Sequence, residues 1–188
     1  MASRRNLVEV FPMHDIVMIG SSIFEFWGKP ELGKLNVKNC AIRSTQSKDW
    51  LDKKYDDLPT ASHILIYCGS NDLIYGKTPQ QIVENVCALL GKLSAKFPQA
   101  QLGYFSIMLC PQKQAAQQLE LIESINTRIK TFCSNEFSFF NFNDFIDNDP
   151  KWFVEDGLHL TEQAYQMLNS KLTPVLTQWV NTNSRIAD

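Results

Sequence analysis

The sequence predicts an α/β fold built on a parallel sheet. Short apolar runs alternate with longer segments whose apolar residues recur at helical spacing, which is the pattern of alternating strands and helices. One run, His63–Cys68, is almost continuously apolar, as expected for a central strand covered on both faces. No internal repeat, linker or low-complexity stretch interrupts the 188 residues, so we predict one domain over residues 1–188.

Four further runs complete the predicted sheet. Leu35–Cys40 alternates between apolar and polar residues, which places it nearer an edge than His63–Cys68. In chain order, the predicted strands are Asp15–Ile19, Leu35–Cys40, His63–Cys68, Leu102–Ile107 and Phe137–Phe142.

Three amphipathic helices lie between and after these strands. Thr78 caps the first helix, Pro79 suits its first position, and Gln81 completes a capping box. Thr161 is predicted to cap the last helix, and Pro174 to kink it. We assign their apolar stripes to the core: Ile82, Val86, Leu89, Leu90, Leu93 and Phe97; Leu121, Ile122, Ile125, Ile129 and Phe132; and Ala164, Leu168, Leu172, Val175 and Trp179.

Charge and composition exclude several classes of partner. The net charge is −2 and the pI about 5.9, with no block of like charges, which argues against nucleic acid. No window approaches the roughly 18 consecutive apolar residues of a membrane span, and Glu9 and Pro12 interrupt any signal-peptide core. Five cysteines without a Cys-x-x-Cys pair argue against a disulfide framework and a metal site. We therefore predict a reduced, cytoplasmic protein.

Four polar clusters border the predicted strands and the last helix. In an open parallel sheet, sites form beyond the carboxyl ends of the strands, so these clusters are expected to meet in one crevice. They are Gly20-Ser21-Ser22-Ile23, Asn39-Cys40-Ala41-Ile42-Arg43-Ser44, Gly69-Ser70-Asn71-Asp72 and Asp156-Gly157-Leu158-His159.

The four clusters together contain the groups that acyl transfer requires. A serine hydroxyl such as Ser22 needs a base, and His159 is a candidate. The imidazole in turn needs a carboxylate such as Asp156 to fix its tautomer, and the oxyanion needs preplaced donors such as the Asn71 amide. Each cluster alone has a structural explanation as a turn or a helix cap, so the prediction rests on their combination and order.

In this combination the sequence resembles the SGNH or GDSL hydrolases, and among them the platelet-activating-factor acetylhydrolase-like esterases. Gly20-Ser21-Ser22-Ile23 is similar to the first block of the family, and Gly69-Ser70-Asn71-Asp72 fully matches its third block, Gly-x-Asn-Asp. Asp156-Gly157-Leu158-His159 matches its last block, Asp-x-x-His. The resemblance extends from about Asp15 to the last helix.

The resemblance implies a flavodoxin-like, three-layer α/β/α sandwich with five parallel strands in the order 2-1-3-4-5. It also implies a serine esterase in which Ser22, His159 and Asp156 are catalytic. The oxyanion hole would consist of the backbone amides of Ser22 and Ser44 and the side chain of Asn71. No cofactor and no metal are expected, and the implied partner is a small-molecule acyl ester. The family's substrates include short acyl esters, acetylated sugars, lysophospholipids and thioesters, and the resemblance does not choose among them. Because the sequence has no inserted lid domain, we expect small acyl groups such as acetyl.

Two positions depart from the family pattern. Ser21 replaces a more common aspartate, which mainly supports the turn. Ser44 stands where the family usually has a glycine whose amide is the third oxyanion donor. Serine keeps that amide, but its Cβ restricts the backbone, so the geometry of the oxyanion hole is open at this stage.

Two other functions remain as alternatives. One is a catalytically idle module of the same fold that binds a carbohydrate or a protein, for which only Ser44 argues. The other is a flavodoxin-like nucleotide binder, but the sequence lacks the phosphate-binding loop that this function requires.

Six residues are candidates to line a substrate pocket: Arg43, Trp50, Ile74, Tyr75, Trp152 and Phe153.

Overall fold

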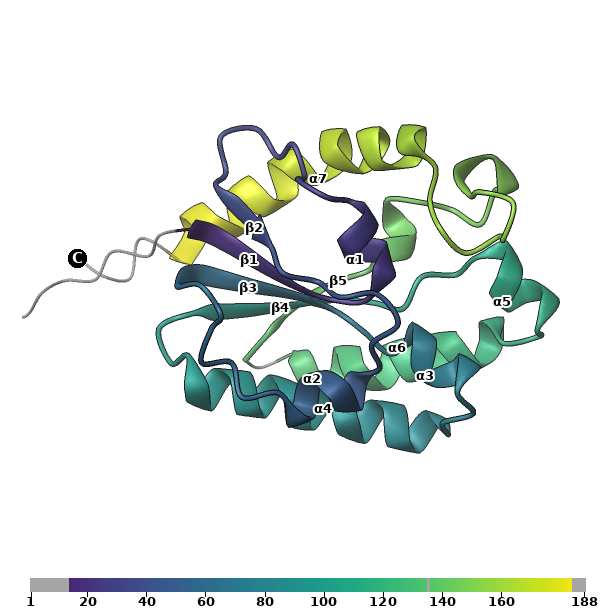
Figure 1. Ribbon diagram of the computed structural model, residues 1–188, viewed down its shortest axis with the longest axis horizontal. Coiled ribbons are helices and arrows are strands. Elements are labelled where there is room, and N and C mark those ends of the chain that lie inside the picture. Colours follow the sequence, from purple (N-terminus) through teal and green to yellow (C-terminus); the bar gives the residue numbers. More distant parts are fainter. Residues whose placement is uncertain (1–13, 135, 184–188) are drawn as a thin grey trace, which may run out of the picture.

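The computed structural model of the protein describes residues 14–134 and 136–183. Within these ranges, five strands form one parallel sheet in the order β2-β1-β3-β4-β5 (Figure 1). The strands are β1 (His14–Gly20), β2 (Val37–Asn39), β3 (Ala61–Tyr67), β4 (Gln101–Phe105) and β5 (Ser138–Phe140). The predicted α/β class and strand order are confirmed.

Helices cover both faces of this sheet. Helices α1 and α7 lie on one face, whereas α2, α4 and α6 lie on the other, which gives the three-layer α/β/α arrangement (Figure 1). The α-helices are α1 (Ser22–Phe26), α2 (Ser47–Asp52), α3 (Ser70–Ile74), α4 (Pro79–Lys96), α5 (Pro111–Ala115), α6 (Leu119–Cys133) and α7 (Glu162–Asn183). Two 3-10 helices, η1 (Phe142–Asp144) and η2 (Pro150–Trp152), precede α7.

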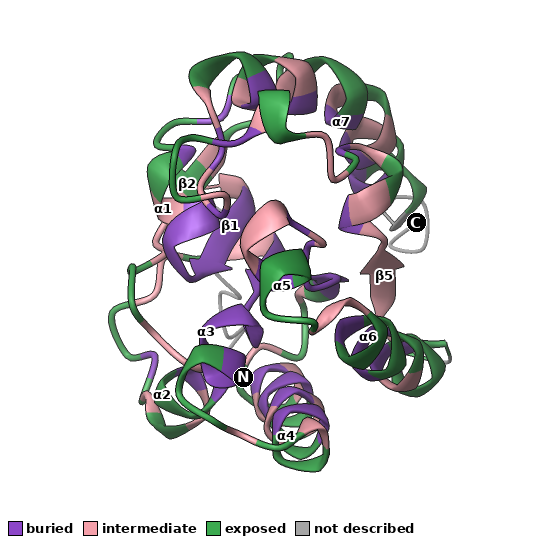
Figure 2. Ribbon diagram, turned by 90° about the vertical axis from the view of Figure 1, so that its right-hand side faces the viewer, coloured by how far each residue is buried: buried purple, intermediate pink, exposed green. Residues whose placement is uncertain are grey.

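The central strand β1 shows how the sequence builds two hydrophobic cores. Side chains alternate across a strand, so Ile16 and Met18 enter the core beneath α7, while Val17 and Ile19 enter the core beneath α2 and α4. All four side chains are fully buried. Figure 2 shows the same division in the helices, which turn their buried residues inward and their exposed residues outward.

The predicted starts of the long helices are confirmed. Thr78 Oγ1 accepts a hydrogen bond from the Gln81 amide at 3.2 Å, and Gln81 Oε1 accepts from the Thr78 amide at 3.0 Å, which is the predicted capping box. Thr161 Oγ1 accepts from the Ala164 amide at 3.2 Å. Helix α7 continues on both sides of Pro174.

The structure differs from the prediction mainly at the edge strands and the short helices. The Leu35–Cys40 strand is shorter than predicted, because only Val37–Asn39 pairs with β1. Helices α1, α3 and α5 have five residues each, too few for an apolar periodicity to predict them. No helix in the described ranges is both long and apolar enough to cross a membrane.

Candidate active site

The turn after β1 places Ser22 at the carboxyl edge of the sheet. Gly20 has a φ of 143°, and a Cβ atom built on it would lie 2.0 Å from the carbonyl oxygen of Tyr67 on neighbouring β3. Only glycine permits this close approach. The chain then turns so that Ser21 donates its amide to the same Tyr67 carbonyl at 3.0 Å, and Ser22 becomes the first residue of α1.

Ser22, His159 and Asp156 form one hydrogen-bonded chain. Ser22 Oγ lies 2.9 Å from His159 Nε2, and His159 Nδ1 lies 2.5 Å from Asp156 Oδ2. An ionised carboxylate can only accept, so Nδ1 must carry the proton and donate it to Asp156. In the neutral imidazole, Nε2 is then free to accept from the Ser22 hydroxyl. The fold therefore brings the three predicted catalytic residues together, although Ser22 lies at least 134 positions before the other two in the sequence.

The second oxygen of Asp156 holds the turn that carries His159. Oδ1 accepts from the amides of Leu158 and His159, both at 2.9 Å. Burial by itself raises the pKa of Asp156, but hydrogen bonds from the His159 side chain and from these two amides outweigh it and hold the pKa below its ordinary value. Asp156 is therefore both the partner of the imidazole and the organiser of its loop.

The imidazole of His159 also makes an aromatic contact that the sequence analysis did not identify. Phe26, at the end of α1, lies with its ring centroid 4.9 Å from that of His159, at an interplanar angle of 54°. The phenyl ring is 45% exposed, so it borders the site at the surface. Helix α1 thus contains both Ser22 and a residue that contacts His159.

The three predicted oxyanion donors have hydrogens available. Ser22 begins α1, so its amide has no partner within the helix. The Ser44 amide makes no hydrogen bond to another described backbone group. Asn71 Nδ2 donates one of its two hydrogens to the Thr45 carbonyl at 2.9 Å, which leaves the second for a ligand.

The loop after β2 lies beside the serine turn and adopts a strained conformation at Ser44. Ile42 donates its amide to the Gly20 carbonyl at 2.8 Å, and the Asn71–Thr45 bond joins the same loop to α3. Ser44 has a φ of 63°, in the left-handed region that favours glycine. The departure from glycine noted in the sequence therefore falls on a position whose backbone suits glycine.

Asn39, which begins the second polar cluster, has a structural role. Its side-chain amide donates to the carbonyls of Phe24 at 2.5 Å and Gly28 at 2.9 Å. Its Oδ1 accepts from the Ala41 amide at 3.1 Å. These bonds fix the end of β2 against α1.

Comparison with known proteins identifies the family of the chain. Residues 20–167, most of the chain, match the GDSL-like lipase/acylhydrolase family. The chain belongs to this family. It is therefore a carboxylic ester hydrolase.

Similar structures and one curated relative extend the comparison. A protein from Streptococcus pneumonia, provisionally described as a platelet activating factor, has a TM-score of 0.76 and 24% identity over 91% of this chain and 87% of its own. An acetyl esterase variant with acetate ion has a TM-score of 0.68 and 14% identity over 90% of this chain and 99% of its own. N-acylneuraminate cytidylyltransferase of Escherichia coli O18:K1:H7 is 19% identical over 176 residues. That alignment covers 86% of this chain but only 40% of the relative's length.

Most of the residues that were candidates to line the substrate pocket of this GDSL-like hydrolase are buried or bonded to other parts of the protein. Trp50 is buried in the core and donates to Thr45 Oγ1 at 2.9 Å. The other indole, Trp152, donates to Asp147 Oδ1 at 2.8 Å, and Phe153 is buried. Arg43 forms an exposed ion pair with a carboxylate of α1, Glu25, at 3.9 Å. Ile74, the last residue of α3, and Tyr75, which follows the helix, are exposed and remain candidates for substrate contact.

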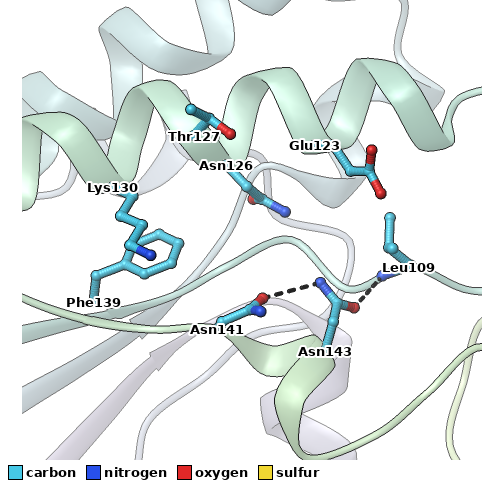
Figure 3. A pocket seen from close by; sticks show the side chains of 8 residues that line it. All are labelled: Leu109, Glu123, Asn126, Thr127, Lys130, Phe139, Asn141 and Asn143. Atoms are coloured by element: carbon cyan, nitrogen blue, oxygen red, sulfur yellow. Dashed lines mark hydrogen bonds between the residues drawn. The ribbon is translucent and has the colours of Figure 1, made fainter.

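A pocket of about 380 Å³ between α6 and β5 contains none of the predicted site residues (Figure 3). Its Asn126 side chain bonds to the backbone of Ile107, accepting from the amide at 2.8 Å and donating to the carbonyl at 2.9 Å. Asn143 accepts from the Leu109 amide at 2.8 Å. The pocket is lined by Leu109, Glu123, Asn126, Thr127, Lys130, Phe139, Asn141 and Asn143. The side-chain amides of Asn126 and Asn143 therefore hold the backbone of Ile107 and Leu109.

Residues 14–134 and 136–183 contain no group of three or more His, Cys, Asp or Glu side chains placed to hold a metal ion. The five cysteines are free thiols.

Proposed function

We propose that this hydrolase is a serine esterase that uses Ser22, His159 and Asp156 as its catalytic triad. The observation that carries the proposal is the continuous chain from Ser22 Oγ through His159 to Asp156, at 2.9 and 2.5 Å. These distances lie within hydrogen-bond reach, as nucleophile activation requires. The low pKa of Asp156 keeps its carboxylate ionised, so it can stabilise the imidazolium that forms.

In the acylation step, His159 Nε2 takes the proton of the Ser22 hydroxyl as Oγ attacks the carbonyl carbon of the ester. A bond forms between Oγ and that carbon, and the carbonyl electron pair moves to its oxygen. His159 then returns the proton to the alcohol oxygen as the ester bond breaks. Water repeats the sequence on the acyl-enzyme and releases the acid.

The negative oxygen of the tetrahedral intermediate faces the amides of Ser22 and Ser44 and the Asn71 side chain. Each of these groups has a hydrogen that the described part of the protein does not use. Donors that are already in place cost no reorganisation when the charge develops. The strained φ of Ser44 supports this assignment, because it lies where the family usually has a glycine.

The acyl group is small, with acetyl as the first candidate. The helices that follow the strands around Ser22, α1 and α3, have only five residues each. Apart from the strands and helices of the α/β/α sandwich, the described ranges contain only the short helices α3, α5, η1 and η2, so they include no separate lid domain that could enclose a long acyl chain. The acetyl esterase with a similar fold makes an acetyl ester the first substrate to test.

Hydrolysis of p-nitrophenyl acetate, butyrate and octanoate by the wild-type chain tests the proposal. We expect turnover that falls with acyl length and that disappears in Ser22→Ala, together with labelling by a fluorophosphonate probe. Ser21→Ala is the matched control, because Ser21 is an adjacent buried serine that makes no side-chain cap bond. Labelling that survives in Ser22→Ala, or that disappears in Ser21→Ala, would contradict the assignment. Absence of turnover on every ester would instead favour the idle binding module.

A further inference from the structure

Helix α5 contains a buried lysine that the proposed chemistry does not use. Lys113 is 1% exposed, although lysine is rarely fully buried unless it is paired. None of the carboxylates in the described ranges forms an ion pair with it. Its Nζ instead donates to the carbonyl oxygen of Ser70 at 3.1 Å. Burial lowers the pKa of Lys113, and the nearby Cys110 thiol opposes this effect only in part.

The hydrogen bond from Lys113 to the Ser70 carbonyl restrains the backbone of the third polar cluster, Gly69-Ser70-Asn71-Asp72. The Ser70 carbonyl belongs to the peptide that joins Ser70 to Asn71, so a restraint on this oxygen fixes the backbone from which the Asn71 side chain extends. The far end of that side chain is held by the Thr45 carbonyl at 2.9 Å. Asn71 is thus restrained at both its backbone and its amide, and Lys113 provides the first restraint.

The same short helix also contacts the loop that carries the base. The Gln112 amide donates to the Gly157 carbonyl at 2.9 Å, between Asp156 and His159 in the sequence. A Cβ atom on Gly157, whose φ is 67°, would lie 3.1 Å from Gln112 N and 3.2 Å from Pro111 Cβ, so the two segments are packed closely. Figure 2 looks onto this edge of the molecule, with α5 in front and α1 and α3 beside it.

We propose that Lys113 is a positioning residue that holds the Asn71 turn in register with the Asp156–His159 loop. Two successive residues of α5 bind the two halves of the site. Gln112 binds the loop that contains Asp156 and His159, and Lys113 binds the turn that contains Asn71. The role of Lys113 is exerted through Asn71 and rests on the proposed esterase function. Loss of the ammonium leaves the nucleophile and base in place but allows the Asn71 donor to move away from the developing oxyanion.

A double-mutant cycle between Lys113→Met and Asn71→Ala tests this role on the full chain with p-nitrophenyl acetate. Methionine keeps the length of the side chain and removes the donor and the charge. We expect Lys113→Met to lower kcat by roughly 10- to 100-fold with a change in KM below about 3-fold, because the lost contact acts in the transition state. In the Asn71→Ala background the same substitution should change kcat by less than about 3-fold, since coupled residues are not additive.

Lys92 provides the matched control. It is a second lysine whose Nζ donates to backbone carbonyls, those of Leu51 at 2.6 Å and Lys53 at 2.7 Å, away from α5. Lys92→Met is expected to lower the melting temperature without lowering kcat. A Lys113→Met variant that behaves in this way, or whose loss in kcat multiplies with that of Asn71→Ala, overturns the proposal.

Two further measurements keep the result unambiguous. If Lys113→Met does not fold, Lys113→Gln takes its place in the cycle. Glutamine keeps N–H donors without the charge, so this variant is expected to lose less kcat. Ser22→Ala is assayed beside the cycle. Turnover that persists in Ser22→Ala refutes the proposed function, whereas Ser22-dependent turnover with multiplicative losses refutes only the role of Lys113.

Discussion

The buried carboxylate of Asp72 binds Ser47 twice, accepting its backbone amide at 2.9 Å and its hydroxyl at 2.5 Å. Ser47 is the first residue of α2, where the amide has no partner within the helix. Because Asp72 directly follows Asn71, the contact ties the Gly69–Asp72 turn to the segment that contains Ser44. The sequence pattern Gly-x-Asn-Asp thus contains one residue that we propose as an oxyanion donor, Asn71, and one that holds the neighbouring loop, Asp72.

Asp72→Asn is expected to destabilise the protein by about 2 kcal/mol, since an asparagine amide offers a donor where two donors must be accepted. The loop that carries Ser44 should also lose order, so kcat falls as well. Denaturant unfolding and ester turnover measure the two effects. Asp52→Asn is the control, because Asp52 forms an exposed ion pair with Lys48 on the same helix and should change stability by less than about 0.5 kcal/mol. Equal effects of the two substitutions would exclude a special role for Asp72.

The activity is expected to fall on acidification. His159 must be neutral to accept the Ser22 proton, and imidazole groups in general titrate at roughly pH 6–7. Asp156, whose pKa is held below its ordinary value, stays ionised through this range, so the acid limb should reflect the loss of one base. Initial rates between pH 5 and 9, with unfolding measured over the same range as a control, check this expectation. A flat profile down to about pH 5 would contradict the role of His159.

Asp156→Asn is expected to lower kcat by about 10²–10⁴-fold while the chain stays folded. Asp156 is the partner of His159 Nδ1 among the described residues, and an asparagine amide facing Nδ1 favours the wrong tautomer. Turnover and fluorophosphonate labelling, read together with the melting temperature, distinguish this effect from unfolding. Asp149→Asn is a suitable control because Asp149 is a surface residue paired with Lys151. Retention of full activity in Asp156→Asn would mean that another group orients the imidazole.

The sequence predicted which side chains meet at the candidate site better than it predicted the short elements around them. Ser22, Asn71, Asp156 and His159 were identified because each stands in a short motif whose spacing is set by chemistry. Lys113 was not identified, because it lies in a polar segment, and its burial results from packing between loops that are distant in the sequence.

The same distinction applies to the fold. The buried strand β3 and the helix that begins at Thr78 follow from local apolar patterns and a capping box, and the structure contains both. The short helices α1, α3 and α5 are formed by turns and tertiary contacts, such as the close approach of Gly20 to Tyr67. Trp50 was expected as a candidate pocket residue, but it lies in the core. The sequence alone does not distinguish an aromatic side chain in a pocket from one in the core.

Asn71→Ala is expected to lower kcat by roughly 10²–10³-fold with a smaller change in KM, because its amide meets a charge that exists only in the transition state. The side chain also donates to the Thr45 carbonyl, so a modest loss of stability should accompany the change. Steady-state kinetics and thermal unfolding measure both. Asn126→Ala is the control, since that carboxamide bonds to the Ile107 backbone outside the site and should affect stability more than kcat. A change confined to KM would assign Asn71 to substrate binding alone.

Ser44→Gly is expected to preserve or raise kcat, because it keeps the backbone amide and removes a side chain from the site. Two effects on stability oppose each other. Glycine relieves the left-handed conformation at φ 63°, which costs a non-glycine residue about 1–2 kcal/mol, but it adds entropy to the unfolded chain, which costs roughly 0.5–1 kcal/mol. The melting temperature should therefore change little.

Ser44→Ala separates the hydroxyl of Ser44 from its Cβ atom. Alanine keeps the backbone strain and removes only the hydroxyl, so a kcat close to wild type in Ser44→Ala, with a higher kcat in Ser44→Gly, would show that the Cβ atom constrains the oxyanion hole. Large losses in both variants, with folding intact, would show that the hydroxyl contacts the substrate. In that case this enzyme has gained a polar contact at the position where its family usually has glycine. Kinetics of the three forms on p-nitrophenyl acetate distinguish these outcomes, because only the hydroxyl explanation predicts that alanine and glycine both lose activity.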